Sequence, residues 1–312
     1  MNVYHFSDAL NSGVVIKKIT NAYTVRQHDR TLVCSLSTQL KRHSDSDPVA
    51  LGDHVRWNEA LQITEVLSRR NKLARRASVP MPGAHAHEQV IAANLDRVIP
   101  VFAAANPKPA WHLLDRYLVS AESAHIPALV VVTKMDLVAG KPEADEIDVI
   151  AGEYRACGYD VILTSAETGT GVSALRAALS GTLAVLVGKS GGGKTSLLNV
   201  IEPGLGLRVQ STNRVTGKGR HTTTHLEAFE LQSGGAIIDT PGIREFGLWD
   251  LARDELAMYF PEMRRWVGKC RFGLSCQHDQ EPGCEIRLAV GRGEISPYRY
   301  QSYLKLKLEG QP

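Results

Sequence analysis

The glycine-rich segment GKSGGGKT, residues 188–195, constrains the fold more than any other part of the sequence. It fits the pattern G-x-x-x-x-G-K-[ST], with an apolar run before it and the helix-forming run SLLNVI after it. In such a strand–loop–helix unit, backbone N–H groups surround phosphates, the lysine reaches the β and γ phosphates, and the hydroxyl ligates Mg²⁺. The alternative is a simple glycine-rich turn, which would not require a strand directly before the loop and a helix directly after it. The predicted phosphate-binding residues are Gly188, Lys189, Ser190, Gly191, Gly192, Gly193, Lys194, Thr195 and Ser196.

The apolar pattern divides the chain into three parts. Five short β-branched runs predict a small barrel, either an OB-fold or an SH3-like barrel. They occupy residues 13–20, 22–28, 30–36, 53–58 and 61–67. From about Val90, strand-like and helix-like runs alternate, which predicts a parallel sheet with helices on both faces. The sequence after Gly242 reads as helical and irregular, so we predict domains at 1–75, 76–248 and 249–312.

The run LVVVTKMDL, residues 129–137, raises a question of order. It ends in Thr133-Lys134-Met135-Asp136, which resembles the base-reading motif Asn-Lys-x-Asp of GTPases. The aspartate of that motif accepts hydrogen bonds from guanine N1 and N2, and the lysine packs along the base. Ser165 and Ala166, after the next strand-like run, resemble the element whose backbone N–H contacts guanine O6. Both elements precede the phosphate loop here, whereas in most GTPases the base-reading motif follows it. The sequence therefore predicts a GTPase in which the usual order of the motifs has been changed by joining the old chain ends and opening the chain elsewhere.

Thr133 stands where the base-reading motif normally has Asn. The structural hydrogen bond that the Asn side chain supplies must therefore be replaced. Asp136, the main discriminator of guanine, is retained, so we expect guanine specificity to be retained too.

Downstream of the phosphate loop, Asp239 ends an apolar run and opens the sequence Asp-Thr-Pro-Gly. This resembles the D-x-x-G element, in which the aspartate holds Mg²⁺ and the amide of the glycine, here Gly242, senses the γ phosphate. Between the two elements, residues 219–224 read GRHTTT. A threonine there would complete the Mg²⁺ shell, and we favour Thr223; a polar loop with incidental threonines is the alternative.

Many GTPases use a Gln directly after D-x-x-G to orient the attacking water. This chain has Ile243 at that position, which cannot do so. His221, beside the threonines, is the candidate catalytic residue, because a neutral imidazole accepts a hydrogen bond from water near physiological pH. The alternative is that His221 binds RNA phosphate or solvent.

Cys270, Cys276, His278 and Cys284 form the pattern C-x₅-C-x-H-x₅-C. Three thiolates and one imidazole suit a closed tetrahedral Zn²⁺ site with no position left for substrate, so the predicted role of the zinc is structural. The alternative is three unpaired cysteines and a surface histidine. A short domain with few large apolar side chains needs such a metal.

The net charge of the 312-residue chain is only +3. Residues 1–75 carry eleven Lys or Arg against seven Asp or Glu, which favours RNA contact by the barrel. The candidate phosphate-binding cations are Lys17, Lys18, Arg26, Lys41, Arg42 and Arg56. A denser basic run at 69–76 is either an RNA contact or an exposed linker. No apolar run has membrane-spanning length and no secretory signal opens the chain, so the prediction is a cytoplasmic protein without membrane contact.

The order TKMD, TSAETG, GKSGGGKTSLLN, GRHTTT and DTPG, with the cluster CRFGLSCQHDQEPGC, resembles the small-ribosomal-subunit-dependent GTPase A family. The likeness covers nearly the whole chain. It implies an N-terminal OB-fold, a circularly permuted α/β P-loop GTPase domain, and a C-terminal helical zinc-binding domain. It also implies hydrolysis of GTP to GDP, stimulated by the small (30S) ribosomal subunit and its 16S rRNA, late in assembly of that subunit. We expect the protein to be a monomer.

Two other functions stay open at this point. One is a slow, GTP-gated rRNA-binding scaffold, which the missing Gln keeps open. The other is an ATP-using P-loop enzyme, against which TKMD and TSA argue.

Overall fold

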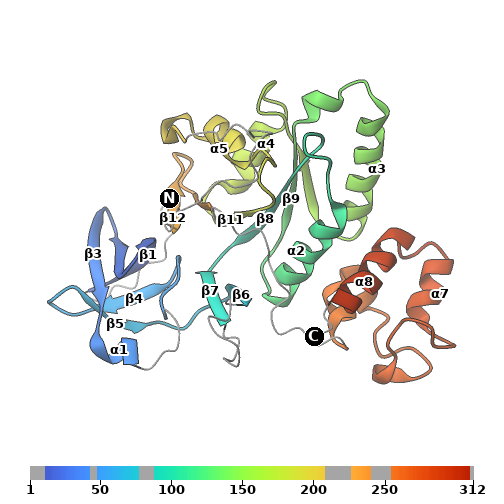
Figure 1. Ribbon diagram of the computed structural model, residues 1–312, viewed down its shortest axis with the longest axis horizontal. Coiled ribbons are helices and arrows are strands. Elements are labelled where there is room, and N and C mark those ends of the chain that lie inside the picture. Colours follow the sequence, from blue (N-terminus) through green and yellow to red (C-terminus); the bar gives the residue numbers. More distant parts are fainter. Residues whose placement is uncertain (1–10, 43–47, 77–87, 208–225, 240–253, 310–312) are drawn as a thin grey trace, which may run out of the picture.

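The computed structural model describes residues 11–42, 48–76, 88–207, 226–239 and 254–309. Figure 1 shows a small barrel and a helical C-terminal part on opposite sides of a central α/β part. This three-part architecture confirms the predicted fold class. In the described parts of the chain, no helix is both long and apolar enough to cross a membrane.

The barrel contains the five predicted strands and one short helix that the sequence pattern missed. The elements are β1 (Ser12–Ile19), β2 (Ala22–Gln27), β3 (Arg30–Leu36), α1 (Thr38–Arg42), β4 (His54–Trp57) and β5 (Gln62–Val66). They close in the order β1-β2-β3-β5-β4, with β4 paired back to β1 and β3 parallel to β5. This Greek-key closure is that of an OB-fold and decides against the SH3-like alternative. Tyr23 and Trp57 are buried in the barrel core, at 1% and 5% exposure.

The central part alternates strands and helices as predicted. Its elements are β8 (Arg97–Ala103), α2 (Trp111–Ser123), β9 (Leu129–Thr133), η1 (Met135–Val138), α3 (Pro142–Ala156), β10 (Asp160–Leu163), α4 (Val172–Leu179), β11 (Leu183–Val187), α5 (Lys194–Ile201), η2 (Pro203–Leu205), β12 (Leu226–Glu230) and β13 (Ala236–Asp239). The strand order is β10-β9-β8-β11-β13-β12, parallel except for β12. Alternate strand residues pack in two cores, one under α2 and α3 and the other under α4 and α5. Runs such as LVVVT are therefore wholly buried.

A hairpin of two unpredicted strands, β6 (Lys72–Arg76) and β7 (Glu88–Ala93), joins the barrel to the central part. Arg69 makes a bidentate pair with Asp53, whose side chain is 0% exposed. Arg70 pairs with Asp96 and Lys72 pairs with Glu88. These three cations of the basic run at 69–76 are thus engaged within the chain. The hairpin also crosses the predicted boundary between residues 75 and 76.

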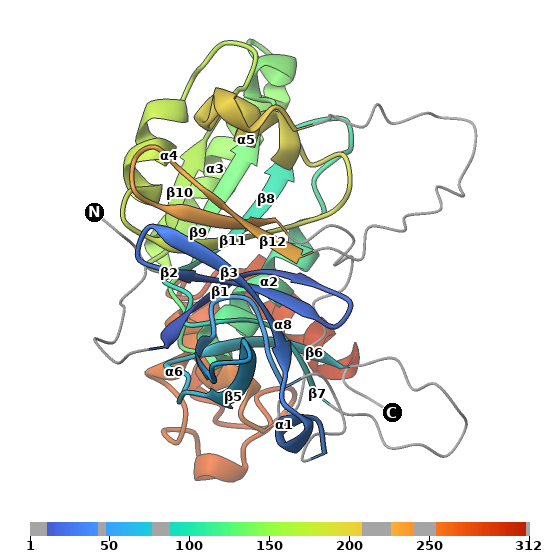
Figure 2. The same ribbon diagram turned by 90° about the vertical axis from the view of Figure 1, so that its left-hand side faces the viewer.

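A second junction makes the two parts one continuous sheet. Strand β12 at the edge of the central sheet pairs antiparallel with β1 of the barrel, which gives eleven strands in a single hydrogen-bonded order. Figure 2 shows β12 alongside the barrel strands. Nothing in the sequence pattern predicted this pairing.

The C-terminal part is helical and irregular, as predicted. It contains η3 (Leu256–Tyr259), α6 (Pro261–Arg264), η4 (Gly273–Ser275), α7 (Glu285–Gly291) and α8 (Pro297–Glu309). Its small core includes Phe260, Met263 and Tyr303, three buried cysteines, and Val119 from helix α2. The last contact shows that this part packs directly on the central part.

Candidate nucleotide site and metal cluster

The phosphate loop lies between β11 and α5, as its motif requires. Gly188 has φ +144° and Gly193 has φ +88°, both in the region that favours glycine. A Cβ on Gly188 would lie 2.4 Å from the carbonyl oxygen of Val101 in β8, so no side chain fits there. The loop is therefore pressed against the carboxyl end of the neighbouring strand, where ligands bind in open α/β sheets.

Lys194 and Thr195 begin helix α5 directly after the loop. The Lys194 ammonium donates hydrogen bonds to the carbonyl oxygens of Gly188 at 2.6 Å and Lys189 at 3.0 Å. The charge therefore lies over the loop, where it can meet the β and γ phosphates of a nucleotide. The Thr195 side chain, in the first turn, is half-buried beside it.

Thr133 makes a buried hydrogen bond to the phosphate loop from the position where the motif normally has Asn. It ends β9, its side chain is 3% exposed, and its hydroxyl donates to the carbonyl oxygen of Gly192 at 2.7 Å. A Cβ on Gly193 would lie 2.8 Å from the same hydroxyl, so the contact is close. The base-reading segment and the phosphate loop are thus tied together across 59 positions of sequence.

Thr133→Val is expected to weaken GDP binding by about tenfold. Valine has nearly the same shape but cannot donate a hydrogen bond. The buried Gly192 carbonyl is then left unpaired, which costs about 1–2 kcal/mol of free energy. Equilibrium titration with a fluorescent GDP analogue measures the change. Thr133→Ser is the matched control, because it keeps the donor. Equal affinities of the Val variant and the unmodified protein would show that the tie has no role in binding.

Lys134 makes a second hydrogen-bonded link between the base-reading segment and the phosphate loop, which sequence reasoning did not predict. It has φ +59°, and its ammonium donates to the carbonyl oxygens of Gly191, at 2.7 Å, and of Asn106. Asn106 lies in the loop between β8 and α2 and matches no nucleotide-binding motif, so only the folded chain reveals it. Burial lowers the pKa of Lys134, and the nearby Asp136 carboxylate opposes that shift.

Asp136 lies in η1, after Met135, and is oriented by the predicted O6-contacting element. The Ser165 hydroxyl donates to Asp136 Oδ1 at 2.5 Å, and the backbone N–H of Thr168 donates to Ser165 Oγ at 3.2 Å. Ser165 is 1% exposed, and Ala166 follows it in a turn after β10. Since β9 and β10 are parallel neighbours, both segments emerge at the same edge of the sheet. The two predicted base-binding segments therefore lie together.

Asp239 is the last residue of β13, and its Cα is paired with Leu186 of β11. Its backbone thus reaches the sheet edge at which the phosphate loop begins. The Asp239 side chain and the predicted site residues His221, Thr223 and Gly242 lie outside the described residues.

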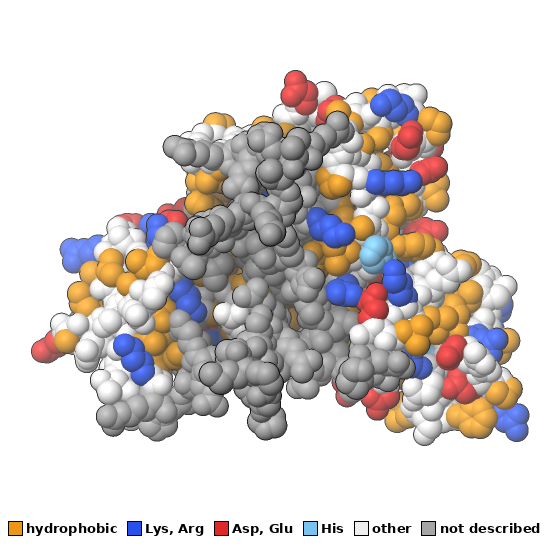
Figure 3. Space-filling model, viewed as in Figure 1, with side chains coloured by type: hydrophobic (Ala, Val, Ile, Leu, Met, Phe, Trp, Pro, Cys, Tyr) orange, Lys and Arg blue, Asp and Glu red, His pale blue; other side chains and the backbone are white. Residues whose placement is uncertain are grey.

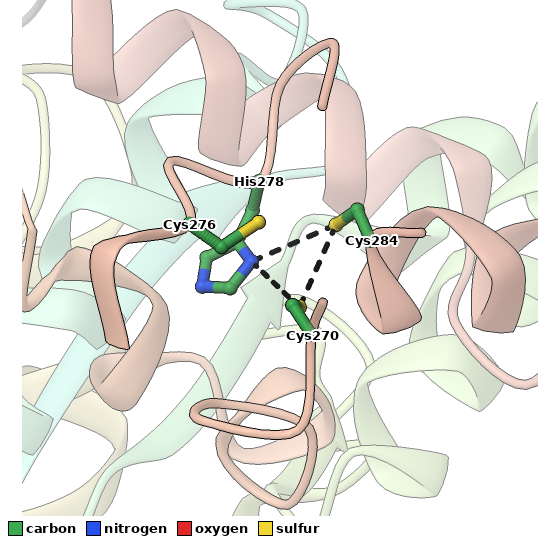
Figure 4. A group of neighbouring side chains, drawn as sticks. All are labelled: Cys270, Cys276, His278 and Cys284. Atoms are coloured by element: carbon green, nitrogen blue, oxygen red, sulfur yellow. Dashed lines mark hydrogen bonds between the residues drawn. The ribbon is translucent and has the colours of Figure 1, made fainter. Parts of the chain in front are cut away.

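The four predicted metal ligands converge in the C-terminal part (Figure 4). The Cys270 sulfur lies 3.4 Å from His278 Nδ1 and 3.9 Å from the Cys284 sulfur, and the Cys284 sulfur lies 3.6 Å from His278 Nδ1. All four ligand atoms, including that of Cys276, lie within 4.8 Å of one another. Tetrahedral zinc with Zn–S about 2.3 Å and Zn–N about 2.0–2.1 Å places ligand atoms about 3.5–3.8 Å apart. The donor set and its spacing fit such an ion.

Burial of the cluster acts in opposite directions on its imidazole and its thiols. Each of the four residues is at most 6% exposed. Burial lowers the pKa of His278, which favours the neutral imidazole that a metal requires. Burial raises the pKa of Cys284 to about 12, so a bound cation is needed to stabilise its thiolate. The backbone N–H of Glu285 donates to the Cys270 sulfur at 3.3 Å, and the Tyr300 hydroxyl donates to the His278 carbonyl at 2.9 Å. These bonds fix the ligands from outside the cluster.

Comparison with known proteins agrees with this arrangement. Residues 66–249 match the family model described as RsgA GTPase. A Gemmatimonas aurantiaca protein named Small ribosomal subunit biogenesis GTPase RsgA is 40% identical over 306 residues, which cover 96% of this chain and 97% of that protein. A Pseudomonas aeruginosa (strain LESB58) protein of the same name is 43% identical over 252 residues, covering 81% of this chain and 73% of its own length.

Two solved structures share the fold over nearly the full length. The crystal structure of YjeQ from Thermotoga maritima is 30% identical, with a TM-score of 0.78, and the alignment covers 97% of this chain and 99% of that one. The structure of YloQ, described as a circularly permuted GTPase, is 30% identical, with a TM-score of 0.71 and coverage of 98% and 96%. These likenesses confirm the permuted order inferred from the motifs.

Proposed function

The chain belongs to the RsgA GTPase family, and on that premise we propose that it binds and hydrolyses GTP in the biogenesis of the small ribosomal subunit. The convergence of the base-reading segment and the phosphate loop carries this proposal. Thr133 and Lys134 bond directly to Gly192 and Gly191, and Ser165 orients Asp136 beside them. Such a set of contacts suits one guanine nucleotide lying across the carboxyl ends of β9, β10 and β11.

The residues of the site divide the work in the proposed reaction. Asp136 accepts the guanine N1 and N2 hydrogens, which discriminates GTP from ATP. Lys194 and the loop amides hold the β and γ phosphates. Thr195 and Asp239, with Thr223, hold Mg²⁺, and the Gly242 amide meets the γ phosphate. The metal would neutralise charge that develops on the transferred phosphoryl group.

We propose that His221 orients the attacking water, because Ile243 cannot replace the usual Gln. In this mechanism the imidazole is neutral and accepts a hydrogen bond from the water. Binding of the small subunit would place the residue correctly and so stimulate turnover.

The small subunit and its 16S rRNA are the proposed partners, a role supported by the names of the relatives. Burial of Tyr23 and Trp57 in the barrel favours phosphate contacts over base stacking. Lys41 and Arg56 remain candidates for these contacts, because their side chains are exposed. Figure 3 shows Lys and Arg side chains on all three parts of the visible face, so the RNA contact need not be confined to the barrel.

The remaining parts of the proposal concern architecture. The metal at Cys270, Cys276, His278 and Cys284 is one structural Zn²⁺, because all four positions of a tetrahedron are filled by protein atoms. The functional divisions are residues 1–75, 76–248 and 249–312. The active protein is a monomer.

Phosphate release from GTP, measured with and without purified small subunits, tests the function. We expect slow release alone and multiple-turnover release with subunits, with GDP but not ADP competing. His221→Ala should lower stimulated turnover by about a hundredfold without changing GDP binding. Subunit binding without accelerated release would favour the GTP-gated scaffold, and equal competition by ADP would favour an ATP-using enzyme. Unchanged stimulated turnover in the Ala variant would remove His221 from the mechanism.

A further inference from the structure

Strand β1 pairs with strands of both the barrel and the central part. Its first residues close the barrel against β4, with Ser12 paired to Arg56 and Val14 to His54. Its later residues pair with β12 of the central sheet, with Lys17 opposite Glu227 and Lys18 opposite Leu226. A register shift between Val15 and Lys17 in the pairing with β2 separates the two halves. Such a bulge bends a strand and lets it change partners.

The pairing continues one strand further, to the predicted magnesium ligand. Glu227, which is opposite Lys17, is also opposite Asp239 of β13. Lys17, Glu227 and Asp239 therefore form one row across three adjacent strands. With strands about 4.8 Å apart, the barrel residue lies only about 10 Å from the Asp239 backbone.

Two ion pairs fix β12 in this register. Lys17 Nζ lies 2.9 Å from Glu227 Oε2, and Arg26 in β2 lies 2.9 Å from Glu230 Oε1. The two acids are near opposite ends of β12, a strand of five residues. A slip of one residue would break both pairs and turn the strand's side chains to the opposite face. Without β1, β12 would be a short edge strand, free to fray.

We propose that Lys17 and Arg26 of the barrel are positioning residues for GTP hydrolysis, which hold β12 against β13 and so set the position of Asp239 toward Mg²⁺. The inference rests on the proposed function, in which Asp239 is a magnesium ligand. The barrel is then part of the scaffold of the magnesium site, in addition to any RNA contact it makes. Neither cation touches substrate; both act through the β12 backbone.

The full-length double variant Lys17→Glu/Arg26→Glu tests this proposal. It places carboxylates opposite Glu227 and Glu230, and directly opposed like charges weaken strand pairing. We expect the free Mg²⁺ concentration for half-maximal GTP hydrolysis to rise about tenfold, while turnover at saturating Mg²⁺ changes less than twofold. Adding Glu227→Lys and Glu230→Arg should restore the midpoint, because the two pairs then form with exchanged charges.

The neutral variant Lys17→Gln/Arg26→Gln provides a second test if the charge-reversed variant folds poorly. We expect its free Mg²⁺ concentration for half-maximal GTP hydrolysis to rise about threefold. Arg97→Glu is the matched control, because Arg97 of β8 pairs with Asp160 of β10, away from β12, and neither residue belongs to the proposed nucleotide or RNA contacts. An unchanged midpoint in both double variants would overturn the proposal, as would an equal shift in the Arg97 control. GDP binding by the unmodified protein is measured in parallel. If the unmodified protein did not bind GDP, the proposed function itself would be wrong.

Discussion

Cys284→Ser is expected to remove the proposed zinc ion and unfold the C-terminal part. Structural zinc supplies about 10–16 kcal/mol in small domains, more than their apolar cores provide. Here the core of the domain is built around the cysteines themselves, beside Phe260, Met263 and Tyr303. A serine at position 284 leaves three ligands, and the remaining buried thiols lose the cation that stabilises their thiolate forms.

Metal content per chain and the thermal unfolding transition report the result. The variant should lose its equivalent of zinc and the cooperative transition of the C-terminal domain, and a strong chelator should do the same to the unmodified protein. Cys34→Ser is the matched control, because Cys34 is also buried, at 1% exposure, but lies in the barrel. A variant with full metal content and unchanged unfolding would show that the cluster is not a zinc site.

Arg299→Leu is expected to lower the free energy of unfolding by about 3–5 kcal/mol. Arg299 in α8 is 1% exposed and bonds to Asp115 of α2 and to Glu262 of α6, the latter at 2.7 Å. Burial opposes its charge, but the two carboxylates raise its pKa well above the ordinary value. Its guanidinium carbon also lies 4.7 Å from the Phe260 ring centroid. Leucine would leave two carboxylates buried without a cation, which is the costly outcome.

Denaturant unfolding of the two variants Arg299→Leu and Arg265→Leu isolates the effect of burial. Arg265 pairs with Glu294, but the two side chains are 56% and 36% exposed, so its loss should cost less than about 1 kcal/mol. Since Arg299 joins α8 to α2, limited proteolysis should also release the C-terminal domain more readily from the Arg299 variant. Equal stabilities of the two variants would show that the buried pair does not hold the domains together.

The parts of the fold that were predictable had strong local signals. The barrel strands are short, rich in β-branched residues and partly alternating, the central strands are continuous apolar runs, and helix α5 follows its glycine loop. Strand β6 was missed because KLARR is dominated by cations, and β12 because LEAFE is short and equally compatible with a helix. Both strands are stabilised by partners distant in sequence, on which a local pattern carries no information.

The important residues of the nucleotide site and of the C-terminal part likewise fall into two groups, those that the local sequence predicts and those that only the fold reveals. Lys134, Asp136 and the phosphate loop were recognisable because their chemistry fixes their spacing. The Asn106 carbonyl was not, because any residue can offer a carbonyl and its position depends on how β8 ends. Arg299 reads from sequence as one more cation on a polar helix, and only the packing of α8 against α2 reveals its burial.

The pairing of β1 with β12 has a consequence for how this chain is made. Lys18 leaves the ribosome long before its partner Leu226, since roughly two hundred residues separate them. At about 5–20 residues per second, the barrel waits some 10–40 s with that strand edge uncovered. A nascent chain is thus open to mispairing at this edge throughout most of its synthesis. The order of segments that places the barrel first also makes the completed sheet one of the last features to form.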